Sequence, residues 1–255
     1  MDDQKRVLVS GAGSGIGRAI AKELAATGAA IILLGRKHEG LKQTLGMLER
    51  KTDHTILQAD IRDAARIRQA LEGASLTHLD GVVANAGVGG ENHYGVGDRW
   101  TEIIETNLTG TYNLVNECLP YLMKRKDRYR HIVIMSSILA RLGVLNHTGY
   151  CASKSGLLGL MRSWAMEHAT NKILVNALCP GWVTTNMATE GMEAYARQSG
   201  KNYDEVQADQ MAHVPLRKMG TPEEIAALVK FLLSESQTSI TGQVFDINNG
   251  AIMVP

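Results

Sequence analysis

A tyrosine and a lysine, Tyr150 and Lys154, stand four residues apart in a segment whose apolar pattern predicts a helix. Residues at this spacing project from one helix face about one turn apart, so the two side chains are neighbours. A free tyrosine has a pKa near 10, and moving it toward 7 requires about 4 kcal/mol of preference for the phenolate. An adjacent ammonium group favours the phenolate. The pair therefore indicates acid–base chemistry, although two solvated side chains on a helix surface have the same spacing.

A glycine-rich turn lies near the start of the chain. Gly11, Gly15 and Gly17 follow a short apolar run and precede a helical pattern, with Ser14 and Ile16 between them. The common fingerprint Gly-x-Gly-x-x-Gly does not fit, because Ile16 occupies the place of its third glycine. The spacing that is present still provides a tight strand-to-helix turn whose backbone approaches a pyrophosphate at a helix N-terminus. We therefore expect a nucleotide to bind this turn.

The composition excludes several classes of protein. The 255 residues carry a formal net charge of +1, with acidic and basic residues interspersed, so neither nucleic-acid binding nor a polybasic membrane anchor is expected. No apolar run approaches the roughly 18 residues of a membrane span, and no signal peptide is evident. Cys118, Cys151 and Cys179 lack Cys-x-x-Cys spacing, which disfavours both a disulfide framework and a metal site. We expect a cytoplasmic protein.

Short apolar runs alternate with longer helical patterns along the chain. The predicted strands are Arg6–Ser10, Ala30–Gly35, Thr55–Gln58, Gly81–Ala84, His131–Ser136, Leu174–Leu178 and Val244–Ile247. The predicted helices are Ile16–Thr27, Glu39–Arg50, Ala64–Leu71, Asp98–Lys124 (as two helices), Tyr150–Ala169 and Pro222–Leu233. This alternation predicts a Rossmann-type α/β fold, a doubly wound parallel sheet of about seven strands with helices on both faces.

One segment interrupts the alternation. Residues 186–213 lie between a predicted strand and the last helix and are too long for an ordinary connection. In a parallel sheet they would lie beyond the carboxyl ends of the strands, where ligands bind. We expect a substrate lid here, with a plain helical insertion as the alternative. Residues 1–255 are expected to form a single domain that carries both the nucleotide site and the substrate site.

The glycine turn resembles that of the short-chain dehydrogenase/reductases, whose usual pattern is Thr-Gly-x-x-x-Gly-x-Gly, with Ser10 in place of the threonine. The resemblance covers nearly the whole chain, in order and at family-like spacing. It is also carried by Ala84-Asn85-Ala86-Gly87, Asn107, Ser137, Tyr150-x-x-x-Lys154, Pro180-Gly181 and Asp246–Gly250. The last of these departs from the family pattern, because Asp246-Ile247-Asn248-Asn249-Gly250 stands where Asp-Gly-Gly is common. The resemblance implies an NAD(P)-dependent oxidoreductase that interconverts a ketone and a secondary alcohol, similar to 3-oxoacyl or polyketide ketoreductases.

The resemblance also implies four catalytic residues. Tyr150 is the general acid–base, which gives a proton to the substrate oxygen while the nicotinamide delivers hydride. Ser137 hydrogen-bonds that oxygen, and the family spacing selects it over the neighbouring Ser136. Lys154 holds the nicotinamide ribose and tunes Tyr150. Asn107 holds a water beside the lysine, with a helix cap or kink residue as the alternative.

The cofactor site follows family positions as well. Asp60 and Ile61 would flank the adenine, with Asp60 as an ordinary turn acid being the alternative. Val183 and Thr185 would bind the carboxamide and a phosphate. The full set implied for the cofactor is Gly11, Ser14, Gly15, Ile16, Gly17, Arg36, Asp60, Ile61, Asn85, Gly87, Tyr150, Lys154, Val183 and Thr185.

The end of the second predicted strand bears on the choice between NADP and NAD. NAD-dependent Rossmann enzymes place an acidic residue there to bind the ribose 2′-hydroxyl. Gly35 holds this place and Arg36 follows it, and a guanidinium group can bind a 2′-phosphate through two hydrogen bonds. We favour NADP. NAD is the alternative, in which Arg36 and Lys37 are only solvated surface charges.

Other functions stay open beside the NADP-dependent ketoreductase. They are an NAD-dependent dehydrogenase of a secondary alcohol or polyol, a non-catalytic nucleotide-binding regulator and a methyltransferase. Intact Ser137, Tyr150 and Lys154 disfavour the last two. The expected partner is a small carbonyl or alcohol substrate. The walls of the substrate site would come from Leu139–His147, Gly89–Tyr94, Trp182 and the lid.

The resemblance further implies a homotetramer that associates through long helices. Apolar residues of one helix could serve this contact or pack inward. They are Leu157, Leu158, Leu160 and Met161.

Overall fold

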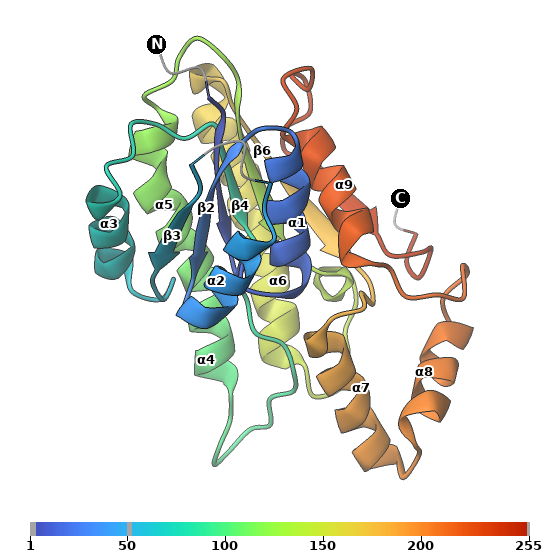
Figure 1. Ribbon diagram of the computed structural model, residues 1–255. Helices are drawn as coiled ribbons and strands as arrows, with labels where there is room; N and C mark the ends of the chain where they lie inside the picture. The colour runs from blue at the N-terminus through green and yellow to red at the C-terminus, as the bar shows by residue number, and fades with distance from the viewer. Residues whose placement is uncertain (1–3, 50–52, 254–255) are drawn as a thin grey trace.

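Seven parallel strands form one sheet in the order β3-β2-β1-β4-β5-β6-β7 (Figure 1). The computed structural model describes residues 4–49 and 53–253. The strands are β1 Arg6–Ser10, β2 Ala30–Gly35, β3 Thr55–Gln58, β4 Gly81–Ala84, β5 Arg130–Met135, β6 Ile173–Pro180 and β7 Val244–Ile247. All seven predicted strands are confirmed. Strands β4, β5 and β6 are buried along their whole length, which explains their mostly apolar sequences.

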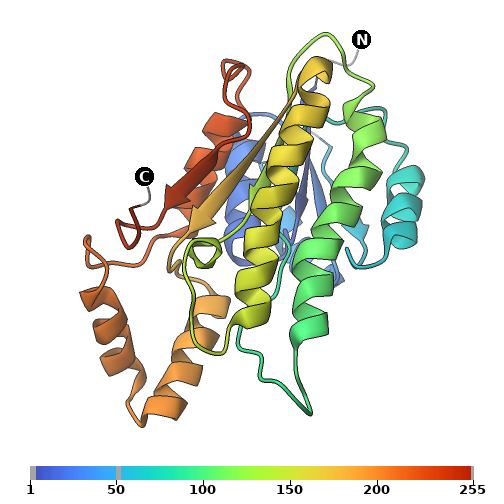
Figure 2. The same cartoon turned by 180° about the vertical axis from the view of Figure 1, so that it is seen from behind.

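Helices cover both faces of this sheet (Figures 1 and 2). One face packs against α1 Gly15–Ala26, α2 His38–Gly46 and α9 Pro222–Leu232. The other packs against α3 Ala64–Gly73, α5 Gly110–Leu122 and α6 Thr148–His168. Each layer of helices shares its own buried apolar cluster with the sheet, so the Rossmann-type prediction is correct. Within the described ranges, no helix combines the length and apolar character needed to cross a bilayer.

Two helix predictions were wrong in detail. Helix α2 ends at Gly46, well before the predicted Arg50, which lies outside the described residues. The segment predicted as two helices is one unbroken helical run, in which a π-helical turn, Glu105–Thr109, joins α4 (Trp100–Ile104) to α5. A π-helical turn accommodates one extra residue without breaking the helix, and apolar periodicity does not reveal it.

The predicted interface residues of α6 pack inward. Leu157, Leu158 and Met161 are buried in the core beneath the sheet, and Leu160 is partly buried against the same cluster. They therefore stabilise the monomer, and the expected homotetramer gains no support from them.

Residues 186–213 form two helices beyond the carboxyl ends of the strands (Figure 1). They are α7 Asn186–Ser199 and α8 Tyr203–Ala212. The pair has a small apolar cluster of its own, made of Met192, Val206, Met211 and Val214. Both the insertion and its position at the ligand-binding edge of the sheet agree with the sequence pattern.

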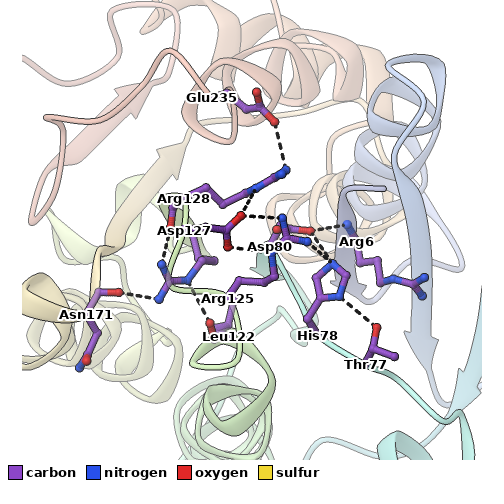
Figure 3. A network of polar contacts seen from close by, with 11 residues as sticks. Arg6, Thr77, His78, Asp80, Leu122, Arg125, Asp127, Arg128, Asn171 and Glu235 are labelled. Atoms are coloured by element: carbon purple, nitrogen blue, oxygen red, sulfur yellow. Dashed lines mark hydrogen bonds and ion pairs between the residues drawn. The ribbon is translucent and has the colours of Figure 1, made fainter. Parts of the chain in front are cut away.

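A buried arginine ties helix ends together at the opposite edge of the sheet. The Arg130 side chain is 1% exposed. Its Nε donates to the Leu122 carbonyl at the end of α5 (3.0 Å), and Nη2 donates to the carbonyl of Asn171, in the turn after α6 (2.5 Å). Nη1 donates to the Arg128 carbonyl. Figure 3 shows Leu122, Arg128 and Asn171 around this point, next to a charged network that includes Asp80. A cation here satisfies carbonyl groups that helix ends leave unpaired.

We expect Arg130→Ala to lower the free energy of unfolding by about 3 kcal/mol, because three carbonyl groups lose a charged donor. Urea denaturation measures this change. Arg68→Ala is the matched control, since Arg68 forms an exposed ion pair with Glu117 and its loss should leave the midpoint nearly unchanged. Equal midpoint shifts in the two variants would contradict the assignment.

Candidate active site

Tyr150, Lys154 and Ser137 meet where β5 ends and α6 begins. The Tyr150 side chain is hydrogen-bonded to that of Ser137. Lys154 Nζ lies 5.5 Å from the centroid of the Tyr150 ring and donates to the Met135 carbonyl at 2.9 Å. Three of the four side chains expected to be catalytic are therefore brought together by one strand end and one helix.

Ser136 points elsewhere and has a different partner. Its Oγ donates to the backbone carbonyl of Lys154 at 2.8 Å, which fastens α6 to the end of β5. Successive residues of an extended chain point to opposite sides, so one serine anchors the helix while the next reaches the tyrosine. The geometry agrees with the family spacing, which selected Ser137.

Burial shifts the pKa values of Tyr150 and Lys154 in the protein alone. It raises the pKa of Tyr150 above its usual range, and the hydrogen bond from Ser137 offsets this only in part. Burial also lowers the pKa of Lys154 to about 8. At pH 7 the phenol is protonated, as that of a free tyrosine also is, and Lys154 stays mainly charged because the pH lies below its pKa. The sequence attributed a Tyr150 pKa moved toward 7 to the Lys154 ammonium together with an oxidised nicotinamide. In the protein alone the pKa moves the other way, because desolvation outweighs the hydrogen bond.

Asn107 lies in the π-helical turn and is fully buried. Its Oδ1 accepts from the Val88 amide at 2.8 Å, and its Nδ2 donates to the Val88 carbonyl at 3.0 Å and to Ser153 Oγ at 3.2 Å. A Cβ atom on Gly87 would lie 3.0 Å from Asn107 Oδ1 and 3.6 Å from Lys154 Nζ. Asn107 is thus a residue of a helix irregularity, as the alternative interpretation held, and it is also close to the lysine.

The glycine turn has the backbone shape that its spacing predicted. Gly11 and Gly15 have φ angles of +66° and +49°, in the left-handed region that favours glycine. A Cβ atom on Gly17 would lie 2.3 Å from the Gly11 carbonyl oxygen, so no side chain fits there. Helix α1 begins directly after this turn. The amide groups of its first turn therefore lie at the edge of the sheet where ligands bind.

Ser10 performs the task that the usual threonine of this motif would perform through its hydroxyl group. Its Oγ accepts from the amides of Asn85 and Ala86, both at 3.0 Å, and Asn85 Nδ2 donates back to the Ser10 carbonyl at 3.0 Å. These bonds join the carboxyl ends of β1 and β4, which are neighbours at the topological switch point of the sheet.

The start of α1 fits a bound phosphate group. Ser14, the residue that precedes the helix, is exposed and its side chain makes no hydrogen bond to the first turn. Those amides are the donors that helices use to bind anions. A Cβ atom on Gly15 would lie 3.3 Å from Thr185 Cγ2, which places Thr185 beside the turn. Val183 is buried nearby on the same connection after β6.

Arg36 and Asp60 form a second charged part of the site. The Arg36 side chain is 51% exposed, with Nη1 4.0 Å from Asp60 Oδ2. Arg62 clamps the same carboxylate, donating from Nη2 at 2.7 Å, and this bond holds the pKa of Asp60 below its usual range. Asp60 also accepts from the Arg62 backbone amide at 3.0 Å, so this carboxylate is both a turn acid and ion-paired, and its place beside the adenine stays a prediction. The Ile61 side chain is buried against Gly110.

Comparison with known proteins assigns the family. A family model described as enoyl-(acyl carrier protein) reductase matches residues 11–251. A 3-oxoacyl-acyl-carrier-protein reductase of Salmonella typhimurium is 34% identical over 254 residues, 98% of each chain. The chain belongs to the short-chain dehydrogenase/reductase family. It is an oxidoreductase that acts on CH–OH and C=O groups.

Two further proteins resemble this short-chain dehydrogenase/reductase along its whole length. The oxidoreductase UcpA of Salmonella typhimurium is 36% identical over 256 residues, which cover 98% of this chain and 95% of that protein. The solved structure of a variant actinorhodin polyketide ketoreductase with NADPH superposes with a TM-score of 0.92 at 30% identity, covering 98% of both chains. The resemblance inferred from the motifs is confirmed.

Two residues of this short-chain dehydrogenase/reductase join the site although no motif marks them. Arg62 holds Asp60, and its signal in the sequence is only a basic residue two positions after an acid. Asn92 contacts the first turn of α6 and has no signal at all, because its partners Thr148 and Gly149 are distant in sequence. The Arg62 contact is local but its spacing is too common to mark a site, and the Asn92 contact depends on how a loop folds back on a helix.

Proposed function

We propose that this enzyme is an NADP-dependent ketoreductase that converts a ketone to a secondary alcohol, with Tyr150 as the general acid. The observation that carries the proposal is the Ser137–Tyr150–Lys154 cluster, which brings a hydroxyl, a phenol and an ammonium group together where β5 ends and α6 begins. A protonated phenol is the form that gives up a proton, as reduction requires. The relatives named as 3-oxoacyl and polyketide ketoreductases support a 3-oxoacyl or polyketide-like substrate.

Each side chain has a separate task in this mechanism. Bound NADPH would supply the hydride. Ser137 donates to the substrate oxygen, and Tyr150 transfers its proton to the same oxygen as negative charge develops there. Lys154 uses one N–H for the Met135 carbonyl, and its remaining donors suit the ribose hydroxyl groups of the cofactor. Its positive charge stabilises the phenolate that proton transfer leaves on Tyr150.

Tyr150→Phe removes the acid while preserving the ring. We expect kcat to fall by 10²-fold to 10⁴-fold, the usual contribution of a positioned general acid, with the Kd for NADPH nearly unchanged. Steady-state reduction of a 3-oxoacyl thioester and a fluorescence titration of NADPH measure the two quantities. Tyr112→Phe is the matched control, since Tyr112 stacks on Trp164 away from the site. A folded Tyr150→Phe protein with near-normal kcat would refute the mechanism.

We infer NADP rather than NAD as the cofactor from Arg36 and Gly35 at the end of β2. No carboxylate stands at the end of this strand to repel a 2′-phosphate. The Arg36 guanidinium is half exposed, and its distance of 4.0 Å from Asp60 is too long for a hydrogen bond. It can therefore turn toward another anion. The solved ketoreductase neighbour with NADPH supports the same choice.

Arg36→Ala should lower kcat/KM for NADPH by about 10-fold to 100-fold, because a phosphate loses its charge-assisted hydrogen bonds. The value for NADH should change little. Parallel assays with both cofactors test this, with Arg68→Ala as a control for general loss of positive charge. Wild-type enzyme that uses NADH as well as NADPH would overturn the cofactor preference.

We propose that α7 and α8 form a lid over the substrate, within a single domain spanning residues 1–255. Two contacts join α7 to the loop that follows β4. A Cβ atom on Gly89 would lie 3.0 Å from Met187 Sδ, so the two segments touch. Farther along α7, Gln198 Nε2 donates to both carboxylate oxygens of Glu91, at 2.9 and 2.7 Å. Such contacts suit an element that closes over a bound molecule.

Gln198→Ala should loosen this closure and raise KM for the ketone by about 3-fold to 10-fold, as the loss of one hydrogen bond to a carboxylate would do. Cleavage by proteases near residues 199–202 should also increase. Gln210→Ala is the control, since Gln210 lies on α8 of the same lid. Identical KM values and cleavage rates in wild type and Gln198→Ala would exclude a lid held by this contact.

A further inference from the structure

Asn92 is a buried polar residue in the loop between β4 and α4, outside every family motif described above. Its side chain is largely buried, with 7% of the residue exposed. Its Oδ1 accepts from the Gly149 amide at 2.8 Å, and its Nδ2 lies 3.0 Å from Thr148 Oγ1 and 3.2 Å from Asp98 Oδ1. A buried side chain with this many polar contacts fixes the relative position of the segments it joins.

Helix α6 receives no side-chain cap from the residue that precedes it. His147, which precedes the helix, makes no side-chain hydrogen bond to the first turn. The oxygen of Asn92 takes this place from a loop more than fifty residues away in sequence. Gly149 makes the contact possible, because a Cβ atom there would lie 3.2 Å from Asn92 Oδ1. The backbone amide of Asn92 also donates to the Asn146 carbonyl at 2.8 Å, which fixes the preceding loop.

The capped turn is the one that carries Tyr150. The loop of Asn92 also holds Val88, which bonds Asn107, and Glu91, which bonds Gln198 of the lid. We propose that Asn92 is a positioning residue that caps α6 from outside and holds Tyr150 against Ser137. The loop that contains Asn92 also contacts the lid through Glu91. The same loop therefore contacts the lid and sets the position of Tyr150. The proposal rests on the catalytic role of Tyr150 stated above.

The test asks whether the side-chain oxygen at position 92, which accepts from the Gly149 amide, is what matters. All variants carry Asp98→Ala, because a carboxylate at position 92 would otherwise be repelled by the carboxylate of Asp98. Asp98→Ala is compared with Asn92→Asp/Asp98→Ala, which keeps the acceptor, and with Asn92→Ala/Asp98→Ala, which removes it. We measure kcat for a ketone substrate, the isotope effect with NADPH deuterated at the transferred position, and the Kd for NADPH.

The Asp variant should stay within about 2-fold of its background. The Ala variant should lose about 10-fold to 100-fold in kcat, because a small displacement of a reacting group has a large effect on rate. Its isotope effect should rise, since the chemical step becomes slower, while the Kd for NADPH stays unchanged. Equal kcat values in the Ala variant and the background would overturn the proposal, as would equal losses in the Asp and Ala variants.

A second variant separates position from stability. Gly149→Ala favours the helix by its intrinsic propensity but pushes against Asn92. We expect kcat to fall without a fall in melting temperature, and an unchanged kcat would contradict the proposal. Asn176→Ala is the control, because Asn176 is equally buried and joins β6 to the segment before β7 through two backbone partners. It should lower stability and leave the isotope effect unchanged. If Tyr150 is not the general acid, the Tyr150→Phe variant will keep near-normal kcat. That result would refute the proposed function and is distinct from any result with the Asn92 variants.

Discussion

The attachment of one helix to the end of one strand governs the chemistry of this enzyme. The Ser136 hydroxyl donates to the Lys154 carbonyl, and the Lys154 ammonium donates to the Met135 carbonyl. Together these bonds place the first two turns of α6 against the end of β5. Because Tyr150 lies one turn before Lys154, its distance from Ser137 follows from the same attachment. The rest of the sheet supplies a rigid, doubly covered support for this junction.

The same attachment shifts the pKa values of the site residues. Residues held between a strand end and a helix lose contact with water, and desolvation favours the neutral form of each. It raises the pKa of Tyr150 and lowers that of Lys154, yet at neutral pH only the tyrosine is fully neutral. A neutral acid beside a cation is suited to giving a proton to an oxygen that becomes negative. For the reverse reaction, the phenolate must be favoured by charge that the protein alone does not supply.

Much of the fold and part of the site follow from sequence pattern. Buried parallel strands such as Gly81–Ala84 are continuous apolar runs, and glycines at 11, 15 and 17 indicate a turn that few other residues permit. The proximity of Tyr150 and Lys154 follows from helical spacing. The direction of the Tyr150 pKa does not, because burial is a property of the packed chain. The π-helical turn around Asn107 and the contact of Asn92 with α6 depend on tertiary packing, which local periodicity does not encode.

The small apolar cluster of α7 and α8 gives the two helices a measure of independence. Met192, Val206, Met211 and Val214 form a cluster separate from the two larger clusters that stabilise the sheet, and Trp182, Met219 and Ala251 from outside the two helices pack against it. A segment with its own core can open or change its sequence without disturbing the strands and glycine turn. Substrate preference can therefore diverge quickly through exchange of this helical pair, while the hydride-transfer machinery stays constant.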